Sequence, residues 1–141
     1  MARVLIIPCG CRGQALAREL VAAGHVVRGT TRDPAKTAAI AAAGAEPYVG
    51  DPDRIGTLMG ALAGVTIVCW LMGTVPVPEL HGGRLRMLFE KLVDTPVRGV
   101  VYEGTEGEAI ARDAAERWRI PVAVLPAGGS PRLAVDGLLG L

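Results

Sequence analysis

A strand, a glycine-containing turn and a helix follow one another near the N-terminus, and this succession limits the possible folds more than any other feature. Residues 3–7 (RVLII) are apolar and rich in β-branched side chains, which is typical of a strand buried on both faces of a parallel sheet. The helix after the turn has Leu16, Leu20 and Val21 on one face, and Gly24 is its expected C-terminal cap. A second strand is predicted over 25–29, so the segment forms a β-α-β unit.

The turn from Pro8 to Gly13 is a candidate pyrophosphate site. Backbone N–H groups at a helix N-terminus point at a bound anion, and the helix dipole favours negative charge there. Dinucleotide-binding folds use G-x-G-x-x-G in this turn, because a Cβ would block the turn, the phosphate or the helix–strand packing. Gly10 and Gly13 fill the second and third glycine positions, whereas Pro8 stands at the first. The pattern predicts that this turn, including Cys11 and Arg12, binds a dinucleotide. Because Pro8 replaces the first glycine, an alternative is a protein with the same fold that has lost the ability to bind the cofactor.

The end of the second predicted strand bears on the choice of cofactor. An NAD site places Asp or Glu there to accept hydrogen bonds from the ribose 2′-OH. This chain has Thr31 followed by Arg32, and a guanidinium suits a 2′-phosphate. Arg12 could add a second positive charge. We therefore predict NADP(H) rather than NAD(H), with two alternatives: Asp33 turned inward to read a 2′-OH, or Arg32 as a solvated surface charge.

The rest of the chain continues the alternation of strands and helices. Asp33 and Pro34 are expected to start the next helix and Asp51 to cap the one after it. Further strands are predicted over 46–49, 65–71, 97–102 and 121–125, with helices over 33–44, 51–64, 83–92, 110–118 and from 131 to the end. Six strands alternating with helices predict a doubly wound, mostly parallel α/β sheet in the order 3-2-1-4-5-6. We expect residues 1–141 to form a single domain.

Composition excludes several classes of protein. A formal net charge of +1 provides no basic field for nucleic acid or an acidic membrane, and an aromatic content of 4% argues against base stacking. The apolar run at 4–7 is too short for a signal peptide, and no segment is long enough to span a membrane. The three cysteines have no framework spacing, which indicates a reducing compartment, and we expect a cytoplasmic protein. Leu- and Ala-rich helices make a homodimer plausible.

Several segments resemble one protein family: 10–13 (GCRG), 15–25 (ALARELVAAGH), 29–32 (GTTR) and 44–51 (GAEPYVGD). Together they resemble the atypical and extended short-chain dehydrogenase/reductases, in particular the NAD-dependent epimerase/dehydratase-like branch. The resemblance implies an NAD(P)-binding Rossmann fold in which Gly10 and Gly13 hold the pyrophosphate and Thr31 and Arg32 lie at the adenosine ribose. It also implies that Asp51 contacts the adenine, and that the strand end formed by Leu71, Met72 and Gly73 lies against the cofactor.

The chain departs from this family's catalytic pattern. Catalytic members have a Tyr followed four residues later by Lys, with a Ser or Thr on the preceding strand, and the Tyr donates or accepts the proton. Tyr48 and Tyr102 are followed at that spacing by Pro52 and Glu106, and the chain ends where family members usually build a substrate region. Two functions therefore stay open: an NADP(H)-dependent oxidoreductase or epimerase-like enzyme, and a non-catalytic dinucleotide-binding redox sensor or scaffold subunit.

Other chemistry-bearing residues have simpler explanations. Cys9 and Cys11 fall short of the four ligands of a structural zinc site, so we expect no metal, and Cys69 belongs in a buried strand. His81 could act as an acid–base group but has no evident partner in the sequence. Glu103 follows the fifth predicted strand, where it could serve catalysis or complement the dipole of the next helix.

Overall fold

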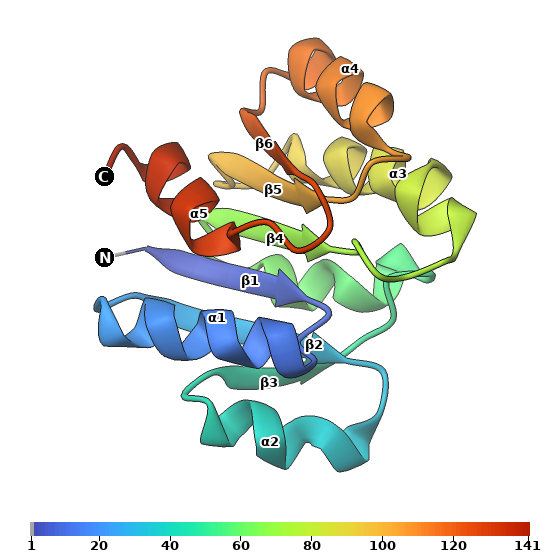
Figure 1. The fold of residues 1–141 in the computed structure, drawn as a ribbon. Coiled ribbons are helices and arrows are strands. Elements are labelled where there is room, and N and C mark those ends of the chain that lie inside the picture. The colour runs from blue at the N-terminus through green and yellow to red at the C-terminus, as the bar shows by residue number, and fades with distance from the viewer. Residues whose placement is uncertain (1) are drawn as a thin grey trace.

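The computed structural model describes residues 2–141, which contain one parallel sheet with the strand order β3-β2-β1-β4-β5-β6 (Figure 1). The predicted doubly wound α/β fold and its strand order are confirmed. The strands are β1 Arg3–Ile7, β2 Val26–Thr31, β3 Glu46–Val49, β4 Ile67–Leu71, β5 Gly99–Glu103 and β6 Val122–Leu125. The α-helices are α1 Cys11–Ala22, α2 Thr37–Ala42, α3 Gly83–Leu92, α4 Glu108–Trp118 and α5 Pro131–Leu139, and the 3₁₀ segments are η1 Pro34–Lys36, η2 Ile55–Leu62 and η3 Pro78–His81.

The sheet separates two hydrophobic layers. Side chains alternate along each strand, so Val4 and Ile6 of β1 face the layer of α1, α2 and α5, whereas Leu5 and Ile7 face η2, α3 and α4. The same division is visible in Figure 1, where α1 and α5 lie together on one face and α3 and α4 on the other. The apolar side of these helices therefore covers the sheet, although Val21 of α1, predicted to lie on that side, is 38% exposed.

Two adjacent strands, β4 and β5, are buried over their whole length. All five residues of β4 (IVCWL) are buried, as expected for a strand covered on both faces. Trp70 fills the layer of η2, α3 and α4, and its indole N–H donates to the carbonyl of Leu80 at 2.8 Å. Among the residues described, no helix combines the length and apolar content needed to cross a membrane.

The segment 55–62 differs from the prediction, because it is 3₁₀ rather than α-helical. Gly56 and Gly60 lower its α-helix propensity, and a Cβ at Gly60 would lie 2.2 Å from the Tyr48 hydroxyl of β3. Arg28 of β2 also holds the end of this segment, donating to the carbonyls of Ala61 at 2.6 Å and Ala63 at 3.2 Å. Tertiary packing therefore decides the conformation that apolar periodicity alone predicted as α.

Element boundaries shift elsewhere by a few residues. β2 begins at Val26 and reaches Thr31, and β5 runs from Gly99 to Glu103, later than the predicted 97–102. The helix predicted over 33–44 begins as the 3₁₀ turn η1 and then continues as α2, with Asp33 as the predicted cap: its carboxylate accepts from the Ala35 amide at 2.9 Å. These shifts move Thr31 and Glu103 to the last positions of their strands.

Candidate functional site

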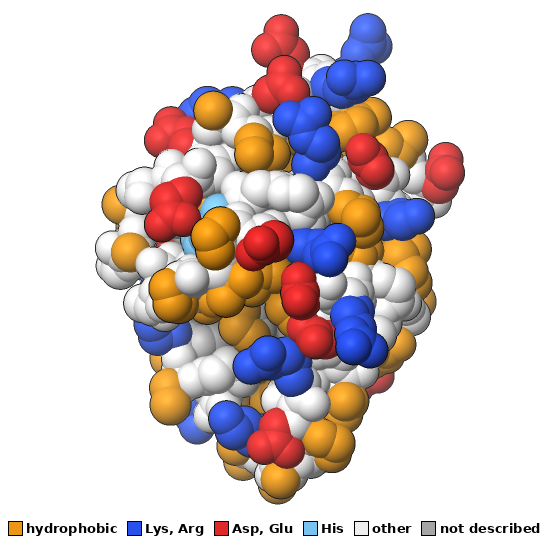
Figure 2. All heavy atoms as spheres, turned by 90° about the vertical axis from the view of Figure 1, so that its right-hand side faces the viewer, with side chains coloured by type: hydrophobic (Ala, Val, Ile, Leu, Met, Phe, Trp, Pro, Cys, Tyr) orange, Lys and Arg blue, Asp and Glu red, His pale blue; other side chains and the backbone are white. Residues whose placement is uncertain are grey.

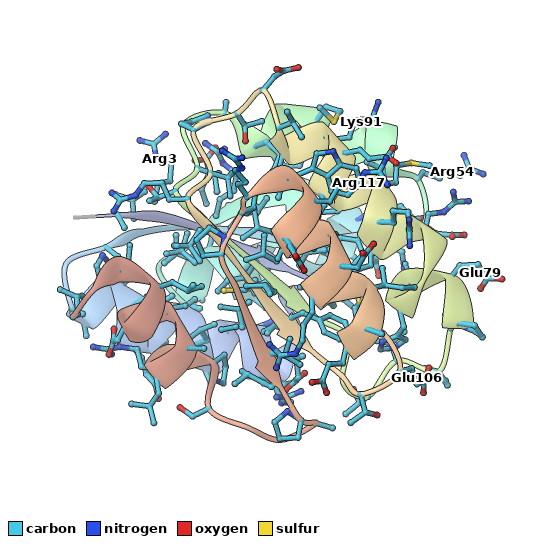
Figure 3. All side chains as sticks on the ribbon, turned by 90° about the horizontal axis from the view of Figure 1, so that it is seen from above. Arg3, Arg54, Glu79, Lys91, Glu106 and Arg117 are labelled. Atoms are coloured by element: carbon cyan, nitrogen blue, oxygen red, sulfur yellow. The ribbon has the colours of Figure 1, made fainter. Side chains whose placement is uncertain are left out.

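The carboxyl ends of the first four strands border a cavity of about 810 Å³. Figure 2 views this edge of the molecule and shows acidic and basic side chains around exposed hydrophobic ones; in Figure 3 Arg54 and Glu79 lie toward it and Arg3 lies at the opposite side. Ligands of open α/β sheets bind at this edge, where the strand order reverses between β1 and β4. The cavity is lined by Pro8, Cys9, Gly10, Gln14, Thr30, Thr31, Arg32, Asp33, Pro34, Lys36, Gly50, Asp51, Pro52, Asp53, Met72, Val75, Val77 and Leu80.

The N-terminus of α1 opens on this cavity through the turn after β1. Gly10 is the N-cap and has no side-chain cap, and the first helical hydrogen bond is donated by the Gln14 amide to the Gly10 carbonyl at 2.8 Å. Within residues 2–141 the amides of Cys11, Arg12 and Gly13 consequently have no acceptor. A Cβ on Gly10 would meet no atom within 4 Å, so the space in front of these donors is open. The turn fits a pyrophosphate despite Pro8.

At Gly13, unlike Gly10, neighbouring atoms leave no room for a side chain. A Cβ at Gly13 would lie 2.9 Å from the carbonyl oxygen of Pro8 and 3.0 Å from Cγ2 of Ile6. The absence of a side chain therefore lets α1 approach β1 closely, which is the role of the third glycine in dinucleotide-binding turns.

Two basic side chains border the cavity beyond the end of β2. Arg32 is exposed, and Lys36 of η1 is exposed on the same border. Asp33 also lines the cavity; Ala35 N–H donates to its Oδ1 at 2.9 Å, and its own amide donates to Thr31 Oγ1 at 3.1 Å. Sequence reasoning missed Lys36, although its position four residues after Arg32 at the start of a predicted helix was an available signal.

The third strand leads into an acidic turn at the cavity. The Asp51 carboxylate accepts from the Asp53 amide at 2.9 Å, so it caps this turn rather than the following helix, whose N-cap is Arg54. Asp53 also accepts a hydrogen bond from Nε of Arg84 at 3.2 Å. The prediction that Asp51 caps a helix is therefore wrong, and Asp51 lines the cavity instead.

Arg12 points away from Arg32 and pairs with Glu103 at the end of β5. Both guanidinium NH groups donate to the carboxylate, Nη1 to Oε1 at 2.6 Å, and Glu103 is completely buried. The amide of Gly73 also donates to Oε1 at 3.1 Å. Burial raises the pKa of Glu103, but Arg12 and the backbone donors outweigh it, so the pKa lies below its usual value. Lys36, rather than Arg12, thus accompanies Arg32.

The opposite wall of the cavity is apolar and is fixed from behind by a buried histidine. Met72, Val75, Val77 and Leu80 form this wall. His81 Nε2 lies 2.9 Å from the Val75 carbonyl, which can only accept, so Nε2 bears the hydrogen and Nδ1 accepts from the Tyr102 hydroxyl at 2.5 Å. The same hydroxyl accepts from the Gly107 amide at 2.9 Å. His81 has a partner that its sequence neighbourhood did not reveal.

The predicted site residues separate into two groups. Leu71 and Gly73 flank Met72 at the end of β4, and Cys11, Arg12 and Gly13 form the first turn of α1. The others line the cavity directly: Pro8, Gly10, Thr31, Arg32, Asp51 and Met72. Cys9 borders the cavity but is buried, and burial raises the pKa of its thiol to about 11, whereas Cys11 is exposed. No group of three or more metal-ligating side chains occurs in the described part of the chain.

A doubly wound sheet, an unoccluded helix N-terminus behind a glycine turn and a cavity at the strand switch define a Rossmann domain that binds a dinucleotide. The family model described as NAD(P)H-binding matches residues 10–114, and the chain belongs to this family. The resemblance to short-chain reductases and epimerase/dehydratase-like proteins is confirmed at this level. A search of curated proteins finds no match.

Solved structures share the fold at low sequence identity. Citrobacter sp. triphenylmethane reductase complexed with NADP(H) superposes with a TM-score of 0.72 at 19% identity, covering 89% of this chain and 49% of that one. A putative NAD-dependent epimerase/dehydratase from Bacillus halodurans gives 0.75 at 15% identity, covering 89% and 70%. Bacillus cereus UDP-glucuronic acid 4-epimerase in complex with UDP-glucuronic acid and NAD gives 0.69 at 15%, covering 89% and 56%. The chain thus spans about half the length of the reductase.

Proposed function

We propose that this protein binds NADP(H) in preference to NAD(H). The supporting observation is the pair of exposed cations, Arg32 and Lys36, on the cavity border just beyond β2. The carboxylate that follows Arg32 in the chain, that of Asp33, accepts from Ala35 N–H through Oδ1 and caps η1. A 2′-phosphate gains charge-assisted hydrogen bonds from such a pair, whereas a ribose 2′-OH would need a free acceptor.

With the 2′-phosphate placed at Arg32 and Lys36, the positions of the other parts of the cofactor can be assigned. The amides of Cys11, Arg12 and Gly13 would hold the pyrophosphate, and Asp51 would contact the adenine. The nicotinamide would lie beyond β1, against Met72 and its neighbours Leu71 and Gly73. The bound nicotinamide supplies hydride-transfer chemistry. The chain's own contribution there is an apolar wall that excludes water and orients the ring.

The experiment is a titration of the purified protein with NADPH and with NADH, followed by nicotinamide fluorescence. Loss of one phosphate contact in Arg32→Ala or Lys36→Ala is expected to weaken NADPH binding about 10-fold and to leave NADH binding nearly unchanged. Arg18→Ala, which removes an exposed arginine of α1 outside the cavity lining, is the matched control. Tighter binding of NADH by the unmodified protein, or full retention of NADPH preference in Arg32→Ala, would refute the assignment.

A non-catalytic role, as a redox sensor or scaffold subunit, is the second candidate. The placement of the tyrosines favours it: Tyr102 is fully buried with its hydroxyl engaged by His81 and Gly107, and Tyr48 packs over Gly60. Neither tyrosine lines the cavity, where a proton donor for hydride chemistry would be needed. Consumption of NADPH with a panel of carbonyl compounds and a triphenylmethane dye distinguishes the two: turnover supports an oxidoreductase, and tight binding without turnover supports the sensor.

A further inference from the structure

The cavity has two ends of opposite chemistry. The charged end lies beyond β2, where Arg32 and Lys36 suit the phosphates of a dinucleotide. The other end lies beyond β4 and is bordered by the apolar wall, which consists of Met72, Val75, Val77 and Leu80. Val77 is 37% exposed, so the fold leaves part of this wall uncovered. A ligand that covers the wall gains free energy from the burial of this apolar surface.

The backbone carbonyls of the apolar wall are already hydrogen-bonded within the protein. The Val75 carbonyl accepts from His81 Nε2 at 2.9 Å, and the Leu80 carbonyl accepts from the Trp70 indole N–H at 2.8 Å. The Val77 carbonyl accepts from the Leu80 amide at 3.1 Å. The wall therefore presents apolar side chains to the cavity, while these carbonyls are engaged behind it.

The side chains of the apolar wall carry no charge, and two nearby carboxylates are engaged elsewhere or point outward. Asp53, which also lines the cavity, accepts from Nε of Arg84 at 3.2 Å. Glu79 of η3 is exposed and does not line the cavity, and in Figure 3 it extends outward from the molecule. Burying a charge or an unpaired polar group against such a wall is unfavourable. The part of a ligand that contacts the wall is therefore neutral and apolar.

The protein itself fills the space beyond β5. Among residues 2–141, none that follows β5 lines the cavity. Glu103 is completely buried and paired with Arg12. A Cβ on Gly104 would lie 2.5 Å from the Tyr102 hydroxyl and 3.0 Å from Cε1 of His81, so the turn after β5 is closely packed as well. The apolar wall is therefore the surface that a second ligand can contact beside the nicotinamide.

We propose that the apolar wall binds a neutral, apolar small molecule, such as an aromatic ketone, beside the nicotinamide of the bound cofactor. The inference rests on the proposed function, and it concerns binding, whether or not turnover follows. It assigns a ligand surface to residues 75–80, for which the sequence predicted no contact. A nucleotide sugar does not fit this surface, because its diphosphate requires charged or hydrogen-bonding partners that the wall side chains do not supply.

The test compares a neutral probe with an anionic probe of the same ring system, methyl naphthyl ketone and naphthoate. Calorimetric titration measures their affinities for the full chain saturated with NADP⁺, so that no hydride is available. Val77→Asp places a charge on the exposed part of the wall, and Val77→Ser replaces it if thermal unfolding shows that the first variant fails to fold. Val93→Asp is the matched control, because Val93 is 50% exposed at the end of α3 and does not line the cavity.

The ketone should bind, and naphthoate should bind at least about 10-fold more weakly, because its carboxylate would lose water without gaining a partner. Val77→Asp should weaken ketone binding about 5- to 10-fold and keep the affinity for NADPH within about twofold, and Val93→Asp should keep both affinities.

Three results would overturn the inference alone: no ketone binding by the NADP⁺-loaded protein, equal affinities for the two probes, or unchanged ketone affinity in Val77→Asp. An equal loss of NADPH affinity in Val77→Asp would also overturn it, because Val77 would then belong to the cofactor site. Failure of the unmodified protein to bind NADP(H) would overturn the proposed function as well.

Discussion

The ion pair of Arg12 and Glu103 predicts an asymmetric response to mutation. Glu103 is completely buried, whereas 41% of the Arg12 side chain is exposed. Arg12→Met leaves a buried carboxylate with only backbone donors such as the Gly73 amide. Glu103→Gln leaves an arginine that can turn into water, and the glutamine oxygen can still accept from Gly73. Truncating the exposed partner should therefore destabilise the fold more than neutralising the buried one.

The magnitudes follow from this difference in burial. Removing one partner of a fully buried pair costs about 3–5 kcal/mol, and the exposure of Arg12 together with the remaining amide donor reduces this to about 2–3 kcal/mol for Arg12→Met. Glu103→Gln should cost about 1 kcal/mol, the net value of the lost charge-assisted bonds. The double variant carries no buried charge, so it should be more stable than Arg12→Met alone.

The difference in the free energy of unfolding between Arg12→Met and the unmodified protein should become smaller at acid pH. In the unmodified protein the pKa of Glu103 is lowered on folding, so its stabilising contribution is present above the unfolded pKa of about 4.3 and is lost as pH falls through the folded value. In Arg12→Met burial without a cation raises the folded pKa of Glu103 above the unfolded value. In this variant the charged Glu103 carboxylate therefore destabilises the fold at neutral pH, and the destabilisation disappears as pH falls toward about 4 and the group is protonated.

Urea unfolding of the four proteins at pH 7 and near pH 4, without cofactor, measures these differences. The exposed pair of Glu108 and Arg112 on α4, with Nε to Oε2 at 2.9 Å, provides the control: Arg112→Met should cost less than about 0.5 kcal/mol. A larger loss in Glu103→Gln than in Arg12→Met, or a double variant less stable than Arg12→Met, would refute the reasoning.

Two further predictions concern the turn after β1. Gly13→Ala places a Cβ within 3.0 Å of Pro8 and Ile6, so it should lower the free energy of unfolding by about 1–3 kcal/mol in a urea titration and should weaken NADPH binding. In the control Gly10→Ala the added Cβ meets no atom within 4 Å, so the free energy of unfolding should stay within about 1 kcal/mol of that of the unmodified protein. In a thiol titration of the native protein with a disulfide reagent, only the exposed Cys11 should react quickly, because burial holds the thiol pKa of Cys9 near 11 and that of Cys69 near 12; rapid reaction of more than one thiol would contradict this.

The topology was predictable because its signals are local. Each strand–helix alternation is visible as apolar runs and helical periodicity, and right-handed crossovers leave few ways to order six parallel strands. The glycine turn was predictable for the same reason: Gly10 and Gly13 act through the backbone within one β-α unit. The α-helix predicted over 51–64 was wrong because packing against Tyr48 and Arg28, which lie outside this segment, fixes the 3₁₀ conformation of 55–62.

Side-chain pairs across the sheet were beyond sequence reasoning. Arg12 and Glu103 are 91 residues apart, and no local pattern indicates that they meet. Hydrogen-bond satisfaction is equally invisible: Thr30 and Thr31 are identical neighbours in sequence, yet Thr31 Oγ1 accepts from Asp33 and Thr30 Oγ1 has no partner in the described residues. Only the coordinates show which of the two hydroxyls has a partner.

The histidine behind the apolar wall has a consequence for binding kinetics. His81 joins the Val75 carbonyl of the wall to the Tyr102 hydroxyl of the sheet. The apolar wall is thus held in place before any ligand arrives, so little chain entropy is lost there on binding, and association should proceed in a single fast step without a subsequent slow closure of this wall.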